Sequence, residues 1–457
     1  MKKFLLVITL SLFIFTGCRQ GSNSSQNATD DGDSKTLIRT SWSKNANIYE
    51  VNIRQFTPEG TFEAFRQHLP RLKNMGVDIL WLMPINPIGE KNRKGTLGSY
   101  YSIKDYKAVN PEFGSFEDFT ILVNEIHELG MYVIIDWVAN HTAWDNPWTN
   151  EHHDWYVKDT VTGGLLSPFD WTDVVKLDYN NHQMRKAMME SMAFWLEETD
   201  IDGFRCDVAG EVPTDFWDST RMVLEKIKPV FMLAESEKPE LLRRAFDMDY
   251  AWDLLHICNK ISKKEANANN LAEYFAKLDT TLPAGAIKMN FITNHDENSW
   301  NGTEFKRHGD AVETFAVLVS TIPGMSLIYS GQEEGDDHAL KFFERDPIQW
   351  GDYRYEEFYK ALLNLKRENK ALWNGAYGGD IQRIETDKNE SVFAFLREKE
   401  GKAVVVILNL SPDSLSVGFK GDVFEGEYIN LFTGAHANLE PGLKAELKPW
   451  EYQVWSR

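Results

Sequence analysis

The chain has few cysteines, and its charge is strongly of one sign. Only three of the 457 residues are Cys, and two of these, Cys206 and Cys258, lie in apolar runs far from the N-terminus. Such a count excludes the disulfide framework that holds many small exported domains together. The net charge of -20 disfavours nucleic acid and anionic surfaces as partners, because both would repel an acidic protein.

The apolar run at the N-terminus is short. It covers residues 4–15, follows two lysines and ends before Thr16-Gly17-Cys18. A run of this length does not span a bilayer and is typical of a signal-peptide core. A Cys directly after a small residue resembles the bacterial lipoprotein signal, in which Cys18 would become the lipidated first residue. The alternative is an ordinary secretory signal in which this Cys is incidental.

We therefore predict a lipoprotein signal peptide over residues 1–18 and an exported protein that is anchored to a membrane through lipid. Neither residue after Cys18 resembles the acidic signal that retains lipoproteins at the inner membrane, so an outer-membrane location is favoured if the source is Gram-negative. Residues 19–40 are rich in Ser, Asn, Asp and Gly and poor in large apolar side chains, which predicts a flexible tether.

Beyond the tether, short β-rich runs alternate with amphipathic helical stretches. The strand and helix pairs are predicted at 48–56 and 62–75, 79–85 and 116–129, 132–138 and 184–197, 203–208 and 216–227, 231–234 and 241–246, 252–257 and 271–278, 288–292 and 311–320, and 326–329 and 356–367. Eight such units predict an α/β fold, a (β/α)8 TIM barrel, over residues 41–375.

Two segments depart from this alternation. Residues 142–181 follow the third predicted strand, are rich in Trp, Pro and Gly, and are longer than a normal loop between strand and helix, which predicts a small inserted domain. After Gly378 the pattern shows strands alone. Residues 376–457 therefore predict a C-terminal antiparallel β-sandwich domain.

Polar residues collect where the predicted barrel strands end, which is where barrel enzymes place their chemistry. The clusters are Asp136 with Asn140 and His141 after the third strand, Arg205 and Asp207 on the fourth, Glu235 after the fifth, and Asn294, His295 and Asp296 after the seventh. Any one of these could be a buried ion pair, a strand cap or a packing histidine. Four clusters in barrel order predict an active site.

The fourth and fifth strands suggest a division of labour between two carboxyl groups. Alternation puts Arg205 and Asp207 on one face of a strand, and a neighbouring guanidinium favours an ionised carboxylate. Glu235 follows an apolar run and has no basic residue beside it in sequence, which can favour its protonated form. Retaining cleavage of glycosides needs such a pair, with carboxyl groups about 5 to 5.5 Å apart.

These motifs resemble glycoside hydrolase family 13, the α-amylase family, over nearly the whole chain from about Trp42. The matching segments are 136–141, Gly203-Phe-Arg-Cys-Asp207, Glu235, Asn294-His-Asp296, and the supporting segments 101–106 and 329–333. The resemblance implies that Asp207 is the nucleophile, Glu235 the general acid/base and Asp296 the third carboxylate. It also implies substrate binding by Tyr101, Asp136, His141, Arg205 and His295.

The function predicted is retaining hydrolysis of α-glucosidic bonds, mainly α-1,4, in starch-derived glucans or maltooligosaccharides. A member that acts on α-1,6 bonds or transfers glycosyl groups would keep the same three carboxylates, and Val208 after the nucleophile occurs in members of either linkage preference. A non-catalytic glucan-binding protein on the same fold is a more distant alternative, because such proteins usually lose a catalytic carboxylate.

The sequence predicts no cofactor and no metal. Many members of the family bind a structural calcium ion between the Asn at the position of Asn140 and an Asp of the inserted domain. Here the corresponding segment, 174–178, has Lys176 where that Asp is expected. An ammonium group supplies no oxygen ligand. Lys176 could instead hold the inserted domain to Asn140, or it could be an ordinary surface lysine.

Overall fold

The structure, a computed structural model, describes residues 40–457. The predicted signal peptide, the lipidation site Cys18 and residues 19–39 of the predicted tether lie outside the described residues. Within residues 40–457, no helix is both long enough and apolar enough to cross a membrane.

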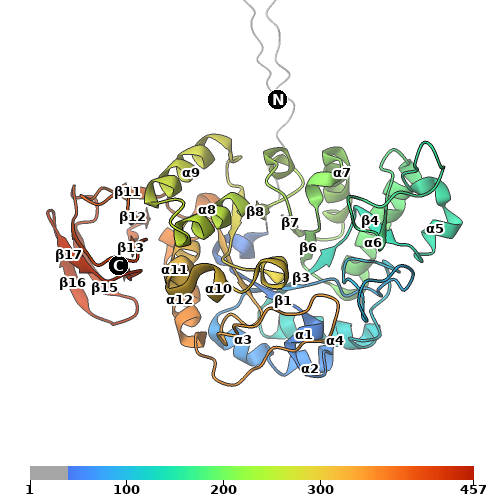
Figure 1. Ribbon diagram of the computed structural model, residues 1–457, viewed down its shortest axis with the longest axis horizontal. Coiled ribbons are helices and arrows are strands. Elements are labelled where there is room, and N and C mark those ends of the chain that lie inside the picture. The colour runs from blue at the N-terminus through green and yellow to red at the C-terminus, as the bar shows by residue number, and fades with distance from the viewer. Residues whose placement is uncertain (1–39) are drawn as a thin grey trace, which may run out of the picture. The chain divides into compact units, whose positions relative to one another are not determined.

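Eight parallel strands form the centre of the larger domain. They are β1 (Ile48–Val51), β2 (Ile79–Leu82), β3 (Tyr132–Trp137), β6 (Gly203–Cys206), β7 (Phe231–Ala234), β8 (Met248–Tyr250), β9 (Ile287–Asn290) and β10 (Met325–Tyr329). They close into a barrel in the order β1-β10-β9-β8-β7-β6-β3-β2 (Figure 1). The predicted (β/α)8 barrel is therefore confirmed.

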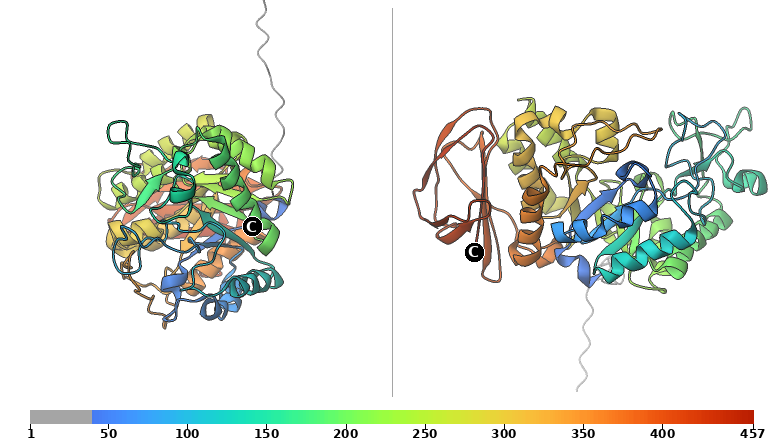
Figure 2. Two further views of the ribbon diagram at one scale, coloured as in Figure 1. Left: turned by 90° about the vertical axis from the view of Figure 1, so that its right-hand side faces the viewer. Right: turned by 90° about the horizontal axis from the view of Figure 1, so that it is seen from below.

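Helices surround the barrel strands (Figures 1 and 2). They are α1 (Ile53–Phe56), α2 (Phe62–Arg66), α3 (Leu69–Met75), α4 (Phe116–Glu128), α6 (His182–Thr199), α7 (Thr214–Leu224), α8 (Trp252–Ser262), α9 (Ala268–Thr281), α10 (Glu304–His308), α11 (Val312–Thr321) and α12 (Glu356–Glu368). The start of α4 shows how the sequence fixes one of them, because Ser115 and Asp118 form a reciprocal capping box. Its side chains at three- and four-residue spacing, such as Phe119 and Val123, are buried.

Alternation along the strands fills the barrel and covers its outside. Side chains such as Trp81, Ile134 and Leu233 form one buried cluster, while neighbours such as Ile135 belong to the larger cluster that includes the helices. At Gly203 a Cβ atom would lie 1.9 Å from the carbonyl oxygen of Phe231, so only glycine allows β6 and β7 to approach this closely.

The predicted sixth strand at 252–257 is wrong. The sixth barrel strand is β8, and the segment predicted as a strand opens helix α8. Strand β8 has only three residues and carries the charged Asp249, so it lacks the apolar run that marks its neighbours. The first strand is also shorter than predicted, because β1 ends at Val51 and α1 follows. The predicted helix at 241–246 is a short 3-10 turn, Pro239–Arg243.

The segment inserted after β3 begins and ends on a small antiparallel pair. Strands β4 (His141–Ala143) and β5 (Val174–Lys176) pair with each other, and α5 (Trp148–Glu151) lies between them in sequence. The hydroxyl group of Ser102, from the barrel, donates to the carbonyl oxygen of Asp173 at 3.2 Å. The insertion thus stands over the barrel mouth, although the domain boundaries themselves stay predictions.

The C-terminal part is entirely β. Its strands are β11 (Gln382–Ile384), β12 (Val392–Lys399), β13 (Lys402–Asn409), β14 (Leu415–Gly418), β15 (Gly426–Asn430), β16 (His436–Leu439), β17 (Lys444–Leu447) and β18 (Tyr452–Ser456). Six of them form an antiparallel sheet, and β14 pairs with β17 in a second sheet. Side chains from both sheets, including Val405 and Val417, share one buried cluster. The hydroxyl group of Tyr452 donates to Glu313 of α11 at 2.6 Å.

Candidate active site

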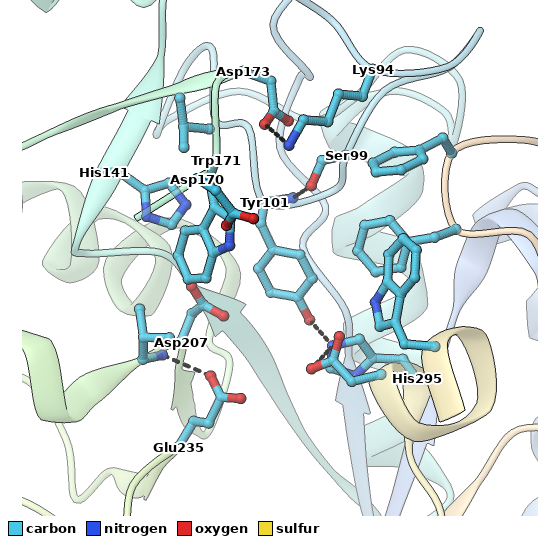
Figure 3. A pocket seen from close by; sticks show the side chains of 16 residues that line it. Lys94, Ser99, Tyr101, His141, Asp170, Trp171, Asp173, Asp207, Glu235 and His295 are labelled. Atoms are coloured by element: carbon cyan, nitrogen blue, oxygen red, sulfur yellow. Dashed lines mark hydrogen bonds and ion pairs between the residues drawn. The ribbon is translucent and has the colours of Figure 1, made fainter. Parts of the chain in front are cut away.

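A cavity of about 400 Å³ lies where the barrel strands end. Six residues that the sequence singled out line it: Tyr101, His141, Asp207, Glu235, His295 and Asp296. Figure 3 shows Asp207 and Glu235 near one another, with the ring of Tyr101 above them. The cavity therefore brings together side chains from four separate strand ends and from the segment after β2.

Arg205 organises the carboxyl groups beneath this cavity. Its guanidinium lies 3.0 Å from Asp207 Oδ1 and 3.0 Å from Glu235 Oε2. On its other side the group lies 2.9 Å from Asp136 Oδ1, and its Nε donates to the hydroxyl oxygen of Tyr250 at 3.0 Å. One positive charge therefore fixes the positions of three carboxylates, two of which face the cavity.

Two of the predicted substrate-binding residues do not line the cavity. Asp136 and Arg205 are fully buried. Besides its contact with Arg205, Asp136 accepts hydrogen bonds from the indole of Trp81 at 3.2 Å and from the hydroxyl group of Tyr101 at 3.1 Å. Because these contacts occupy both groups, the two residues support the side chains that face the cavity rather than presenting their own polar atoms to it.

The sequence argument that Arg205 favours an ionised Asp207 is wrong, and its premise that Glu235 lacks a basic neighbour does not hold in the fold. Glu235 has a basic partner after all, because the pairing of β6 with β7 brings Arg205 to it. Burial raises the pKa of Asp207 well above its usual value, the charge of Glu235 adds to this increase, and Arg205 opposes it. Three carboxylates, those of Asp136, Asp207 and Glu235, therefore share one guanidinium.

This raised pKa predicts a pH-dependent stability difference between the wild type and Asp207→Asn. A carboxyl group whose folded-state pKa is raised stabilises the fold below its unfolded-state pKa, and this contribution is lost as pH rises through the folded-state pKa. The amide does not titrate, so the variant should gain in Tm relative to wild type between about pH 5 and about pH 8. Thermal melts at both pH values measure the change, and a difference that is independent of pH would contradict this reading.

The backbone after Asp207 is strained and holds Glu235. Val208 has φ of +37°, a left-handed conformation that β-branched residues rarely adopt. In this conformation its N–H donates to Glu235 Oε2 at 2.7 Å. The same oxygen also faces Arg205, so the Glu235 carboxyl group is fixed from two directions.

On the opposite wall, His295 connects Asp296 to the barrel interior. Its Nδ1 lies 2.5 Å from Glu50 Oε1, and its Nε2 lies 2.7 Å from the hydroxyl oxygen of Tyr101 and 3.3 Å from Asp296 Oδ2. Burial lowers the pKa of His295, but the carboxylates of Asp296 and Glu50 outweigh it and raise this pKa well above its usual value. The imidazolium in turn keeps the pKa of Asp296 below its usual value despite burial.

His141 is electrostatically different from His295. It is buried, its Nδ1 lies 3.2 Å from the amide nitrogen of Asn140, and its ring meets that of Trp171 edge to face at 5.4 Å. Burial without a carboxylate partner lowers the pKa of His141 to about 3. The side chain is therefore a neutral hydrogen-bonding group at the cavity wall.

The residues present do not fit the structural calcium site that the resemblance to family 13 suggested. The side-chain amide of Asn140 faces His141. Lys176 lies opposite His141 in the register of β4 and β5, and no contact of its ammonium with Asn140 is found among residues 40–457. No group of three or more His, Cys, Asp or Glu side chains in this part of the chain is arranged to hold a metal ion.

We therefore expect chelation to leave stability unchanged. A thermal melt with excess EDTA should give the same Tm as a melt with added Ca²⁺, because residues 40–457 hold no cluster of carboxylates placed to bind the ion. Metal analysis of the purified protein provides the second readout. A large fall in Tm that Ca²⁺ restores, with one bound equivalent that Asn140→Ala removes, would contradict this expectation.

Several cavity residues are absent from the sequence predictions. Trp300 is 57 % exposed, and its ring lies 5.2 Å from that of Phe342. Lys94, from the segment after β2, pairs with Asp173 of the insertion at 3.0 Å. Lys94 lies in an irregular segment and Trp300 in the short π-helical turn Glu297–Asn301, so no periodicity marks them and only their charged or aromatic character could have drawn attention to them.

Comparison with known proteins gives family matches for both the barrel and the C-terminal domain. Residues 22–363 match the family described as "Alpha amylase, catalytic domain", and residues 384–447 match "Alpha amylase, C-terminal all-beta domain". An α-amylase of Dictyoglomus thermophilum is 26 % identical over 463 residues, which covers 85 % of this chain and 89 % of that protein. An α-amylase of Haloarcula japonica is 26 % identical over 412 residues, but the chain spans only 59 % of its length.

Solved structures agree with both the fold and the family. A noncanonic maltogenic α-amylase from Thermotoga neapolitana has 30 % identity and a TM-score of 0.83, covering 90 % of this chain and 98 % of its own. An α-amylase from Lactobacillus plantarum has 31 % identity and a TM-score of 0.80, covering 90 % and 99 %. The family matches in both domains and this likeness over nearly the whole fold confirm the family predicted from the motifs: the chain belongs to the α-amylase family of glycoside hydrolases.

Proposed function

We propose that the protein hydrolyses α-1,4-glucosidic bonds in starch-derived glucans or maltooligosaccharides with retention of anomeric configuration. The observation that carries the proposal is the convergence of Asp207 and Glu235 on one buried guanidinium at the floor of the cavity, 3.0 Å from each. Two carboxyl groups held beside one cavity match the chemistry, which needs one carboxylate and one carboxylic acid at the same bond.

In the first step, an oxygen of Asp207 attacks the anomeric carbon while Glu235 gives its proton to the departing glycosidic oxygen. The bond to the leaving sugar breaks, and an ester bond between Asp207 and the glycone forms. In the second step, Glu235 takes a proton from water as the water oxygen attacks the same carbon. The ester breaks, Asp207 is again a carboxylate, and Glu235 is again protonated.

The remaining cavity residues would bind and distort the glycone. Asp296, kept ionised by His295, would accept hydrogen bonds from sugar hydroxyls and stabilise the positive charge that develops on the ring. Tyr101 offers a ring face beneath the sugar, and its hydroxyl group is already fixed by Asp136 and His295. The neutral His141 would contact sugar hydroxyls from the opposite wall.

A transglycosylase of the same family is the second candidate. A trehalose synthase and a maltosyltransferase are among the relatives, at 26 % and 25 % identity. Product analysis separates the two functions: with soluble starch, pullulan and short maltooligosaccharides in plain buffer, a hydrolase forms one new reducing end for each bond cleaved. Conversion without new reducing ends would favour transfer. Pullulan contains both α-1,4 and α-1,6 bonds, so the products of its cleavage show which of the two linkages the enzyme breaks.

We also propose that the mature protein is a lipoprotein anchored through Cys18. If so, the wild type should fractionate with membranes and partition into detergent, because an acyl chain adds about 0.8 kcal/mol of membrane affinity for each buried CH₂. Cys18→Ser should release the protein or leave it unprocessed. Wild-type protein found entirely in the soluble fraction would contradict the proposal.

A further inference from the structure

We propose that the active-site cavity is closed at the end that receives the non-reducing terminus, so that the enzyme removes a terminal disaccharide rather than cutting inside chains. The inference rests on the proposed hydrolase function and deepens it by naming the substrate end. It comes from the ion pair of Lys94 with Asp173, which spans the cavity rim at 3.0 Å.

The positions of the catalytic groups fix which end of the substrate lies where. Glu235 protonates the departing oxygen, so the leaving part of the glucan lies beyond Glu235. The glycone occupies the other side of Asp207, over Tyr101. Figure 3 shows Glu235 at one end of the cavity, Asp207 and Tyr101 between, and Lys94 with Asp173 at the far end. In an α-1,4-glucan the glycone carries the non-reducing terminus, and the leaving part carries the reducing end. The ion pair, on the side of the cavity away from Glu235, therefore faces the non-reducing terminus.

The rim that carries Lys94 is held from both sides. We define the rim segment as residues 88–98, which follow β2. Toward the insertion, the backbone N–H of Glu90 donates to Asp145 Oδ2 at 3.0 Å. Toward the segment after β10, the N–H of Leu97 donates to the carbonyl oxygen of Phe343 at 3.0 Å, and the N–H of Thr96 donates to Glu344 at 2.9 Å. These contacts tie the rim segment to the insertion on one side and to the segment after β10 on the other.

The side chain of Phe343 packs closely against the backbone of the rim segment at one point. Gly95 has φ of +63°, and a Cβ atom there would lie 2.4 Å from the Cβ of Phe343. From the barrel side, the guanidinium of Arg54 donates to the carbonyl oxygen of Gly98 at 3.1 Å. Both ends of the rim segment are thus fixed to neighbouring elements, so the backbone that carries Lys94 is held in place and its ammonium is held by Asp173.

The space between Asp207 and the rim offers two surfaces for sugar rings. Tyr101 provides the first, and the pair formed by Trp300 and Phe342, with ring centroids 5.2 Å apart, provides the second. The rings of Tyr101 and Phe342 are nearly parallel, with centroids 6.2 Å apart, so the two surfaces adjoin. Two stacking surfaces followed by a closed rim fit a disaccharide.

The ion pair also has the groups to recognise a terminal sugar. The Lys94 side chain is 36 % exposed and that of Asp173 is 6 % exposed, so the ammonium faces the cavity while the carboxylate anchors it. An ammonium has three N–H donors, and Asp173 takes one of them, which leaves donors for the free hydroxyl groups that only a chain end carries. A glucan that continued past this point would lack the free 4-hydroxyl group and would collide with the rim.

The test compares p-nitrophenyl α-maltohexaoside with the same compound carrying a 4,6-O-ethylidene cap on its terminal sugar, with products separated by chromatography. The wild type should release maltose from the uncapped compound, with kcat/KM at least about 100-fold higher than for the capped one. Lys94→Ala and Asp173→Ala should each shrink this preference at least about tenfold, because they open the rim. Lys91→Ala is the matched control from the same segment, since its ammonium lies over Trp144 and outside the cavity, and it should keep the wild-type preference.

Three results would overturn the inference. Equal cleavage of both compounds by the wild type would show an open cleft. An unchanged preference in both rim variants, with turnover of the uncapped compound retained, would show that the ion pair does not set it. Cleavage of neither compound by the wild type would refute the proposed hydrolase function and the inference with it. This result differs from the other two because the uncapped compound is turned over in both of those.

Discussion

Asp207→Asn should lower kcat for maltooligosaccharide hydrolysis by at least about 10⁴-fold, because an amide cannot form the ester with the glycone. The fold should persist, since the amide oxygen can still accept a hydrogen bond from Arg205 at the 3.0 Å contact of the carboxylate. Initial rates with maltohexaose and a thermal melt of the same preparation measure the two effects separately.

Glu235→Gln is the companion variant, and its effect should depend on the leaving group. With maltooligosaccharides it should lose about 10²- to 10⁴-fold in kcat, the usual contribution of a general acid. With a maltosyl fluoride, whose leaving group needs no proton, formation of the glycosyl-enzyme should be nearly normal. Asp207→Asn should be inactive on both substrates. If both variants lost activity equally on the fluoride, the assignment of the two roles would be wrong.

Arg205→Ala should be the most damaging substitution outside the carboxylates. It would leave Asp136 fully buried and unpaired, and it would remove the contact that positions Asp207 and Glu235. Breaking a buried ion pair from one side costs about 3–5 kcal/mol, so Tm should fall by several degrees. Activity should fall at least about 10³-fold as the two carboxyl groups lose their geometry.

Two further variants separate these effects. Arg205→Lys keeps the charge but supplies a single ammonium in place of a planar fork, so it should recover more stability than activity. Arg397→Ala removes a second buried arginine, which donates to the carbonyl oxygens of Gly379 and Thr321 at 2.8 and 2.9 Å, outside the cavity. It should lower Tm without changing kcat on the remaining folded protein. Wild-type kcat in Arg205→Ala would contradict the positioning role.

The sequence predicted the barrel and five of the six cavity residues for a physical reason, whereas Tyr101 came only from the family resemblance. Barrel strands are buried on both faces, so a polar residue at a strand end is conspicuous against its apolar neighbours, and alternation indicates its face. Strand β8 was not predicted because it is three residues long and carries Asp249 in its middle. The amphipathic start of α8 was predicted as the strand instead. Short, polar strands are recognised only through their partners.

The contacts between elements could not be predicted in the same way. The Arg205 contact with Glu235 depends on the register of β6 and β7, in which Cys206 lies opposite Ala234. Sequence separation therefore suggested a neutral environment for Glu235 where the fold supplies a charge. The rim pair of Lys94 and Asp173 likewise joins two irregular segments that are far apart in sequence, and only the closed barrel brings them together.

The most direct test of the account is to trap the covalent intermediate. A 5-fluoro maltosyl fluoride slows the second step more than the first, so the glycosyl-enzyme should accumulate, and peptide mass spectrometry should find the added maltosyl group on Asp207. Proton NMR of the products of an unmodified substrate should show the α-anomer first. A sugar attached to another residue, or initial release of the β-anomer with no adduct, would contradict retaining hydrolysis through Asp207.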